Sequence, residues 1–488
     1  MNNSKLTKVF VYFLILLTSG CSFLPSVGPD YERPTDPAVA EWIIDENGKK
    51  LFSTALSDRT AWWKTFNDPV LAQLVDKGIK NNLTLGIAND RLLQARAAQL
   101  GTIGGFLPAV NGSYSLTRQA QSPRSPIGTF LTNIFDQYQL GFDASWEIDI
   151  FGGTRRQYES ADAQFEAAKA TADDVGVTIA AEIARTYVQY KALQGRLDIA
   201  INNAKSQKES KDLVQVKFDA GVVSDLDLQQ AISLLETTNA TIPTLTGQRD
   251  AALYRLAVLL GEVPQNFTLP ANFEANKSLV WNSNLSIQQP AQFLRIRPDV
   301  RAAERQLASS VADVGVSIAE IFPSIRIGGG MGFQAFNSSE LIEKNSKYWN
   351  FGPQVNVQLF RGGSLVASIK SARRRADEFL KNYELTVLTA LEDAQNSLNA
   401  YKNSLDRIQS LRIAAESSKK SLELSKDLYN QGLTDFQRVL ESQRALFAAE
   451  DALLQGEEQT FTSAIMVYKA FAGGLEETNE ENNKTNNS

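Results

Sequence analysis

The stretch LGFDASWEIDIFGG at residues 140–153 decides the fold that this sequence predicts. Its apolar side chains alternate with polar ones, which is the period of two expected of a β-strand with one apolar face. Two glycines end the alternation. Residues 154–220 then contain no proline and are rich in Ala, Gln, Glu, Lys and Leu, a composition that favours helix. The stretch therefore joins a strand directly to a helix of roughly 100 Å, which no globular core requires.

The same pattern occurs a second time about 210 residues later. The stretch NFGPQVNVQLFRGG at residues 350–363 again alternates, and the run that follows it, residues 364–431, again lacks proline. An internal repeat of this length indicates one body made of two similar halves. The residues that repeat at this spacing are Pro108 and Pro323, Gly152 and Gly362, Gly221 and Gly432, and Gly261 and Gly473.

The first half is expected at residues 62–261. Asp68 suits an N-cap and Pro69 a first helical position, so a helix should begin there and continue to about Gly101. Pro243 should kink the last helix of this half. The elements that follow the first helix are a strand pair at 106–117 and 137–151, a long helix at 154–220 and a return helix at 225–260.

The second half is expected at residues 289–474, after an irregular connecting segment at 262–288. Residues 475–488 are rich in Asn and Glu with almost no apolar side chain, and we expect them to be disordered. The elements expected in the second half are a helix, a strand pair at 323–334 and 350–360, a long helix at 364–431 and a return helix at 435–472.

The N-terminus reads as a signal for export. Residues 1–20 carry Lys5 and Lys8 before an apolar stretch too short to span a bilayer, and Cys21 follows at once. This arrangement resembles a bacterial lipoprotein signal, in which the cysteine thiol receives a lipid, although Thr18 stands where that pattern usually has leucine. A cleaved signal with an incidental cysteine is the alternative. Residues 21–61, rich in proline, are expected to form an extended acylated arm.

The composition argues against an enzyme. Histidine is absent, there are three methionines, and Cys21 is the only cysteine. The chain therefore lacks the commonest general base and metal ligand and any disulfide framework. We predict no catalytic residue, no metal site and no cofactor beyond a covalent lipid on Cys21. A formal net charge of −6 gives no reason to expect nucleic acid as a partner.

The predicted strands suggest membrane contact and a pore. No apolar run after the signal is long enough for a transmembrane helix, so the strands must supply that contact. Four strands cannot close a barrel, and an open edge leaves backbone groups unsatisfied in lipid, so the chain must assemble with copies of itself. Two, three or four copies would give 8, 12 or 16 strands, and the wider barrels hold a water channel. The polar strand face, with Asp143, Glu147 and Asp149, would line that lumen.

Two other structural classes share parts of this pattern. A soluble β-sandwich also alternates, and a cytosolic coiled coil or rod also has long proline-free helices. Four strands of about ten residues with no further β-structure are hard to fit to a sandwich. The export signal and the strand pairs count against a cytosolic rod.

At this point the chain resembles the outer-membrane efflux channel family, which is TolC-like, and within it the lipoprotein branch that serves resistance-nodulation-division pumps. The resemblance runs in consistent order from about Cys21 to Gly474. The blocks that carry it are VGPDYERP at 27–34, WW at 62–63 with FNDP at 66–69, WEIDIFGG at 146–153 and RPDVRAAE at 297–304.

The resemblance implies an α+β membrane protein. Its implied form is a homotrimer with a twelve-stranded outer-membrane β-barrel, four strands per chain, continued by a long periplasmic α-helical barrel. It also implies a passive exit duct for drugs and other small toxic compounds. The implied partners are outer-membrane lipid, a periplasmic adaptor protein and an inner-membrane resistance-nodulation-division transporter.

The resemblance further implies that the turns after Gly221 and Gly432 form the periplasmic entrance, narrowed by acidic residues. Asp435 and Glu441 are the candidates on the second turn, and Arg438 departs from the acidic pattern and could pair with them. Asp435 could instead serve only as a helix cap. Asp225 and Asp227 are weaker candidates on the first turn.

Two other functions remain open from the sequence. The same fold could serve as a duct for secreted proteins or metal ions, although the three methionines and absent histidine disfavour a copper or silver route. The chain could also be a structural lipoprotein with no pore.

Overall fold

The structure is a computed structural model, and it describes residues 26–35, 37, 41–53, 61–120, 122, 124, 134–271, 273 and 285–471. The expected signal, Cys21 and the expected tail at 475–488 lie outside these residues. The chain divides into two compact units. The first unit comprises residues 1–34, 91–168 and 302–384, and the second comprises 35–90, 169–301 and 385–488. No helix in the described part combines the length and apolar character needed to cross a bilayer.

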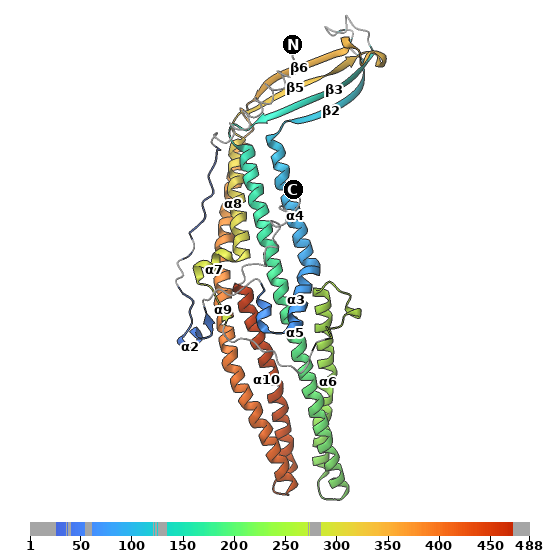
Figure 1. The fold of residues 1–488 in the computed structure, drawn as a ribbon, viewed down its shortest axis with the longest axis vertical. Coiled ribbons are helices and arrows are strands. Elements are labelled where there is room, and N and C mark those ends of the chain that lie inside the picture. Colours follow the sequence, from blue (N-terminus) through green and yellow to red (C-terminus); the bar gives the residue numbers. More distant parts are fainter. Residues whose placement is uncertain are drawn as a thin grey trace, which may run out of the picture. The chain divides into compact units, whose positions relative to one another are not determined.

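The first unit contains a four-stranded antiparallel sheet in the order β2-β3-β5-β6 (Figure 1). Its central pair, β3 and β5, joins one strand from each sequence repeat. The edges of this sheet are β2 and β6. The strands are β2 (Ala109–Ala120), β3 (Ile134–Ile148), β5 (Ser324–Ala335) and β6 (Lys347–Asn356).

The first strand pair lies three residues away from its predicted position. The strand β2 begins at Ala109 because Gly104–Phe106 form a 3₁₀ turn and Pro108 has no N–H to donate to a ladder. The strand β3 ends at Ile148 because Asp149 caps the next helix. In the second pair, β5 begins one residue later than predicted, and β6 ends at Asn356 rather than at residue 360.

Glycines allow β3 and β5 to approach each other closely. Gly141 lies opposite Gly332 in the ladder. A Cβ on Gly332 would collide with the carbonyl oxygen of Leu140 and lie 2.6 Å from the Cα of Gly141. This contact therefore requires glycine at position 332 of β5.

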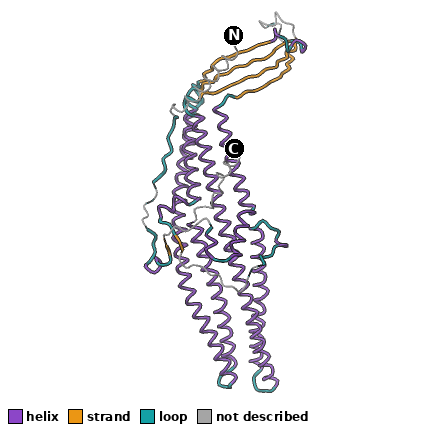
Figure 2. The backbone as a smooth tube through the Cα atoms, in the orientation of Figure 1, coloured by secondary structure: helices purple, strands orange, loops and turns teal. Residues whose placement is uncertain are grey.

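Both repeats contain a long helix followed by a return helix. The long helices α5 (Gly153–Asp219) and α9 (Ser364–Asn430) each have 67 residues, which corresponds to roughly 100 Å. The return helices are α6 (Asp225–Leu259) and α10 (Phe436–Phe471), and Pro243 lies within α6. Each boundary is within one residue of its predicted position. Figure 2 shows how much of the chain is helix and how the four long strands lie together.

The structure corrects two predicted helices. The first is broken at Asn82 into α3 (Pro69–Asn81) and α4 (Leu83–Ile103). The buried Asn82 side chain accepts a hydrogen bond from the Leu85 N–H and donates one to the Leu259 carbonyl, so it caps α4 and holds the return helix. The helix that opens the second repeat is also two helices, α7 (Pro290–Ile296) and α8 (Pro298–Ala319). Arg297 is extended between them, as expected before a proline.

Short elements of the second unit hold the N-terminal arm and the connecting segment. The strands β1 (Phe52–Ser53) and β4 (Leu285–Ser286) pair in parallel. The indole of Trp62 is buried and stacks on Tyr468 with ring centroids 5.4 Å apart. The other short elements of this unit are α2 (Glu46–Lys49), η2 (Trp62–Phe66) and η4 (Pro264–Asn266), and those of the first unit are η3 (Gly104–Phe106), η5 (Ser338–Glu340) and η6 (Lys344–Ser346).

Candidate functional site

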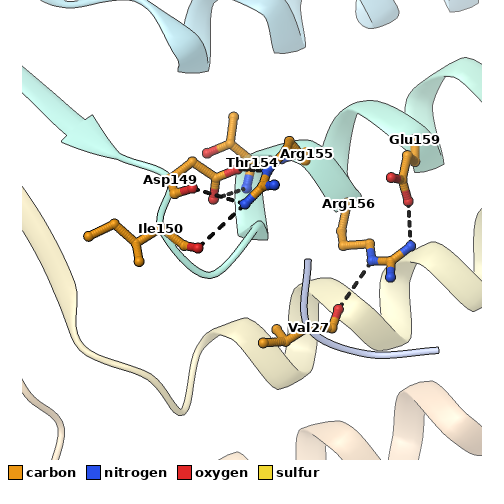
Figure 3. A network of polar contacts seen from close by, with 7 residues as sticks. All are labelled: Val27, Asp149, Ile150, Thr154, Arg155, Arg156 and Glu159. Atoms are coloured by element: carbon orange, nitrogen blue, oxygen red, sulfur yellow. Dashed lines mark hydrogen bonds and ion pairs between the residues drawn. The ribbon is translucent and has the colours of Figure 1, made fainter. Parts of the chain in front are cut away.

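The junction between β3 and α5 is fixed by one carboxylate. Asp149 accepts hydrogen bonds from the N–H groups of Thr154 and Arg155, at 3.1 and 3.0 Å (Figure 3). The Arg155 guanidinium also donates to the same carboxylate at 3.1 Å and to the Asp149 and Ile150 carbonyls. Asp149 therefore satisfies the first free N–H groups of α5 and closes the turn.

The arm is attached to the same helix through Arg156. This guanidinium donates to the Val27 carbonyl at 3.1 Å, to Asp30 at 2.6 Å and to Glu159 at 2.7 Å, and Figure 3 shows the first and last of these contacts. Burial acts to lower the pKa of Arg156, but its two carboxylate partners outweigh that effect and raise it. The segment VGPDYERP thus has a structural role in the first unit.

The three proposed lumen residues differ in their surroundings. Asp143 and Glu147 lie on β3, on the opposite face from Phe142 and Trp146. Asp143 accepts a hydrogen bond from Asn111, and Glu147 forms an ion pair with Arg326 at 2.8 Å. The strand placement predicted for Asp149 is wrong, because this residue follows the strand and is engaged at the helix start.

We call the turns at Gly221 and Gly432 the two tips. Both end the preceding long helix, α5 or α9, in the same way. Gly221 and Gly432 have positive φ, at 71° and 75°. Val222 donates its N–H to the Lys217 carbonyl, and Leu433 donates its N–H to the Leu428 carbonyl, at 2.8 and 2.9 Å. These are the six-to-one bonds of a Schellman motif, which favours glycine at the left-handed position.

The return helices begin differently at the two tips. Ser224 caps α6 and forms a capping box with Asp227. At the second tip, Asp435 accepts a hydrogen bond from the Arg438 N–H at 3.1 Å. With a repeat spacing of 211 residues, Asp435 corresponds to Ser224 and Arg438 to Asp227. The second tip thus carries a charged cap and a cation where the first carries a neutral cap and an acid.

The remaining gate candidates are exposed and have local partners. Arg438 lies 3.9 Å from Glu441, one turn along α10. Glu441 also accepts a hydrogen bond from Gln437 at 3.1 Å, and Asp225 accepts one from Gln229 at 3.2 Å. Within the described residues, no ion pair or hydrogen bond links the charged side chains of the first tip to those of the second.

Each long helix forms a hairpin with its return helix, α5 with α6 and α9 with α10. The two hairpins pack together through residues that the sequence did not single out. Near the tips, an apolar cluster joins α5 and α6 to α9 and α10, and within it the ring centroids of Tyr429 and Phe436 lie 5.4 Å apart. Farther from the tip along α5, polar contacts cross between this helix and the second hairpin. These are Arg196 with Asp451, Asn203 with Glu450, Ser206 with Lys426, and Ser210 with Gln443.

Gln207 lies within this series of polar contacts but lacks a partner. Its side chain is 2% exposed, and neither its amide nitrogen nor its oxygen has a hydrogen bond in the described structure. The amide oxygen of Gln443 and the hydroxyl of Tyr429 are also buried without a partner. Buried polar groups of this kind cost stability. No motif or spacing in a single sequence marks these positions.

Buried or half-buried titratable groups with shifted pKa values are found away from the tips. Burial acts to raise the pKa of Glu304, but hydrogen bonds from Arg305 and Tyr31 outweigh it, and the pKa is lowered. On α10, burial raises the pKa of Glu457 and of Glu458, with Arg412 and Arg196 acting in the opposite direction. No group of three or more metal-ligating side chains occurs among the described residues.

The chain matches one protein family over most of its length. The profile of the outer membrane efflux protein family matches residues 74–262 and 290–473, one segment in each repeat. The chain belongs to the outer membrane efflux protein family. Its duplicated halves, four-stranded sheet and long helical hairpins are therefore those of an outer-membrane channel that extends into the periplasm.

Named relatives and solved structures agree with this assignment. Nodulation protein T of Rhizobium leguminosarum bv. trifolii is 31% identical, over 93% of this chain and 95% of that protein. The toluene efflux pump outer membrane protein TtgF of Pseudomonas putida is 29% identical, over 94% of this chain and 95% of that protein. The outer-membrane channel OprN superposes with a TM-score of 0.83 at 35% identity, covering 92% of this chain and 99% of that chain.

The function of this efflux protein follows from the family. It is an outer-membrane channel component of an efflux pump, and its relatives are channels rather than enzymes. Pump components of this kind work with partner proteins. The junctions, tips and hairpin contacts described above are accordingly parts of a conduit.

Proposed function

We propose that the efflux protein acts as a homotrimer with a closed twelve-stranded barrel. The observation that carries this proposal is the four-stranded sheet with two edge strands, β2 and β6. An edge in lipid would leave backbone N–H and C=O groups unsatisfied, so the edge of one copy should pair with that of the next. Three copies of four strands give a barrel wide enough for water, whereas eight strands would be filled by side chains.

Purified protein tests the trimer and the pore together. Native mass spectrometry should give three times the mass of the acylated chain, and the same preparation should conduct ions across a planar bilayer. A monomer that stays in solution without detergent would contradict the proposal. A trimer that does not conduct would indicate a structural lipoprotein.

We further propose that this trimer is the passive exit duct of a tripartite pump. An inner-membrane transporter of the resistance-nodulation-division class would supply the energy, and a periplasmic adaptor would dock on the tips that follow Gly221 and Gly432. The exposed side chains at both tips, which include Val222 and Leu433 at 69% each, suit a docking surface. Crosslinkers placed at Val222 or Leu433 should capture an adaptor in cells, and failure at both tips would count against docking there.

The proposed cargo is drugs and other small toxic compounds. One relative is named for toluene efflux and another, OpmQ of Pseudomonas aeruginosa, for pyoverdine export. Deleting the gene should sensitise cells to dyes, detergents or antibiotics, and plasmid-borne wild-type protein should restore resistance. Unchanged sensitivity with a cognate pump expressed would favour secretion of proteins or metal ions on the same fold.

We propose that Cys21 carries the covalent lipid that anchors the mature N-terminus. The apolar segment and the cysteine directly after it support this assignment. Cells fed labelled palmitate should label wild-type protein but not Cys21→Ser. Label that persists on the variant would refute the assignment without affecting the proposed pore.

A further inference from the structure

The start of α9 differs from the start of α5, its counterpart in the first repeat. With the repeat spacing of 210 residues, Asp149 corresponds to Leu359 and Ile150 to Phe360. In the first repeat, the turn that leads from β3 into α5 is closely packed. Its Phe151 stacks on Phe322 with ring centroids 4.6 Å apart. In the second repeat Leu359 and Phe360 are 91% and 88% exposed. Two large apolar side chains are thus uncovered where β6 leads into α9.

A basic segment follows these apolar side chains. From Arg361 to Lys381, both included, the sequence has six basic and two acidic residues, in a chain whose net charge is −6. At the corresponding places the first repeat has Ser160 for Lys370, Ala163 for Arg373 and Gln164 for Arg374. Because α5 forms the same kind of helix without these charges, the fold does not require them.

The basic residues border a groove within the first unit. The groove is about 1220 Å³ and lies between the arm at 28–34, α8 and α9. Its apolar lining comes from Leu307, Val311, Val314, Ile318 and Leu380, and its α9 side carries Lys370, Arg373 and Arg374.

Two of these cations are available for a ligand. Arg374 forms an ion pair with Asp377 at 3.0 Å, whereas Lys370 and Arg373 are exposed and have no ion pair among the described residues. The arm contributes two acids to the opposite wall. Asp30 is already bound to Arg156, so Glu32 alone opposes the two free cations.

The groove also lies near the end of the sheet that the proposed barrel places in the membrane, so this step rests on the proposed function. Lys370 and Arg373 are six and nine residues into α9, roughly 9–14 Å along its axis from Ser364, and residues 357–363 join this end of the helix to β6. The polar layer on each side of a bilayer is about 5–8 Å thick, and long basic side chains reach toward it. Exposed aromatic and apolar side chains beside basic ones are typical of membrane interfaces.

We propose that this groove binds an acidic phospholipid of the periplasm-facing leaflet, with an acyl chain on its apolar lining and the phosphate held by Lys370 and Arg373. A second copy of the chain is a poorer match. Its exposed helix α4 offers Leu93 and Leu100, but the helix contains one acid and two arginines, and these would not neutralise the basic segment.

Native mass spectrometry of the full-length protein in detergent tests this site, with dioleoyl phosphatidylglycerol and dioleoyl phosphatidylcholine as probes. Wild-type protein should bind the acidic lipid more tightly. The double variant Lys370→Gln/Arg373→Gln should lose roughly five-fold in affinity for each charge removed, with little change for the neutral lipid. The matched control is Lys205→Gln/Lys208→Gln, which removes two exposed charges from α5 and should keep the preference.

Several results would overturn the proposal. These are equal binding of both lipids by wild type, an unchanged preference in the double variant, and an equal loss in the control. Dissociation of the assembly in the double variant, visible in the same spectra, would show that the cations contact a second copy instead. Dihexanoyl phosphatidylglycerol should bind more weakly than the dioleoyl form, and equal binding would remove the apolar lining from the site.

Discussion

Arg196 on α5 donates two hydrogen bonds to the carboxylate of Asp451 on α10, at 2.6 and 3.3 Å. The two side chains are only 21% and 24% exposed, and they belong to different repeats. This ion pair therefore links the two hairpins. If the entrance opens by separation of the hairpins, the pair must break or move.

Replacing Asp451 with Asn should favour the open channel. The variant keeps an oxygen that can accept one hydrogen bond but loses the charge, which should weaken the link by about 1 kcal/mol. A change of that size corresponds to a roughly five-fold shift in an open–closed equilibrium. Single-channel recording in planar bilayers should show a larger open fraction.

Asp212→Asn is the matched control for this experiment. Asp212 lies on the same long helix α5 as Arg196, is 56% exposed and pairs with the neighbouring Lys211. We expect its open fraction to equal that of wild type. An unaltered record for Asp451→Asn would remove the ion pair from the opening step.

Replacing Gln207 with Leu should stabilise the contact between the hairpins. The change removes a buried amide that has no partner in the described structure and substitutes an apolar side chain of similar size. We expect a gain of about 1–3 kcal/mol in the free energy of unfolding, measured as a higher thermal midpoint. Gln229→Leu, at an exposed position on α6, should leave the midpoint nearly unchanged, and a lower midpoint for Gln207→Leu would show that the amide has an unseen partner.

Two substitutions at Asp435 can separate its charge from its role as a cap. Asp435→Asn keeps an acceptor for the Arg438 N–H, whereas Asp435→Ala removes the acceptor and should cost about 1 kcal/mol of helix stability. If charge narrows the entrance, Asp435→Asn/Glu441→Gln should change conductance or its block by cations as much as the double alanine variant does. A change confined to the alanine variant would assign Asp435 to capping alone.

Much of the fold follows from local sequence signals. Proline-free composition and the glycines at 221 and 432 predict the long helices and their turns to within one residue, because a Schellman turn needs a left-handed residue. The alternation of apolar and polar residues predicts the strands, but it cannot show where the hydrogen-bonded ladder ends. Asp149 continues the alternation of β3, so the pattern predicts a strand position, yet its carboxylate caps α5.

Contacts distant in sequence could not be predicted in this way. Local signals predict Asn82 inside a helix, because its buried partner, the Leu259 carbonyl, is 177 residues away. The ion pair of Arg196 with Asp451 likewise spans 255 residues. Of the proposed gate residues, Asp435 and Asp227 have capping roles that one chain fixes. Whether they also narrow an entrance depends on how copies of the chain assemble, which stays a prediction.

The carboxyl group of Glu458 on α10 should make stability depend on pH. Burial raises its pKa, and the charge of Arg196 offsets this only in part. Because the pKa in the folded state lies above that in the unfolded state, the contribution of Glu458 to stability is greatest below the unfolded pKa and falls as pH rises through the folded one. Glu458→Gln cannot ionise, so its thermal midpoint should exceed that of wild type near neutral pH and match it near about pH 4. Glu416→Gln, at an exposed position, should follow wild type throughout. A midpoint difference that is the same at every pH would show that packing rather than ionisation separates the two proteins.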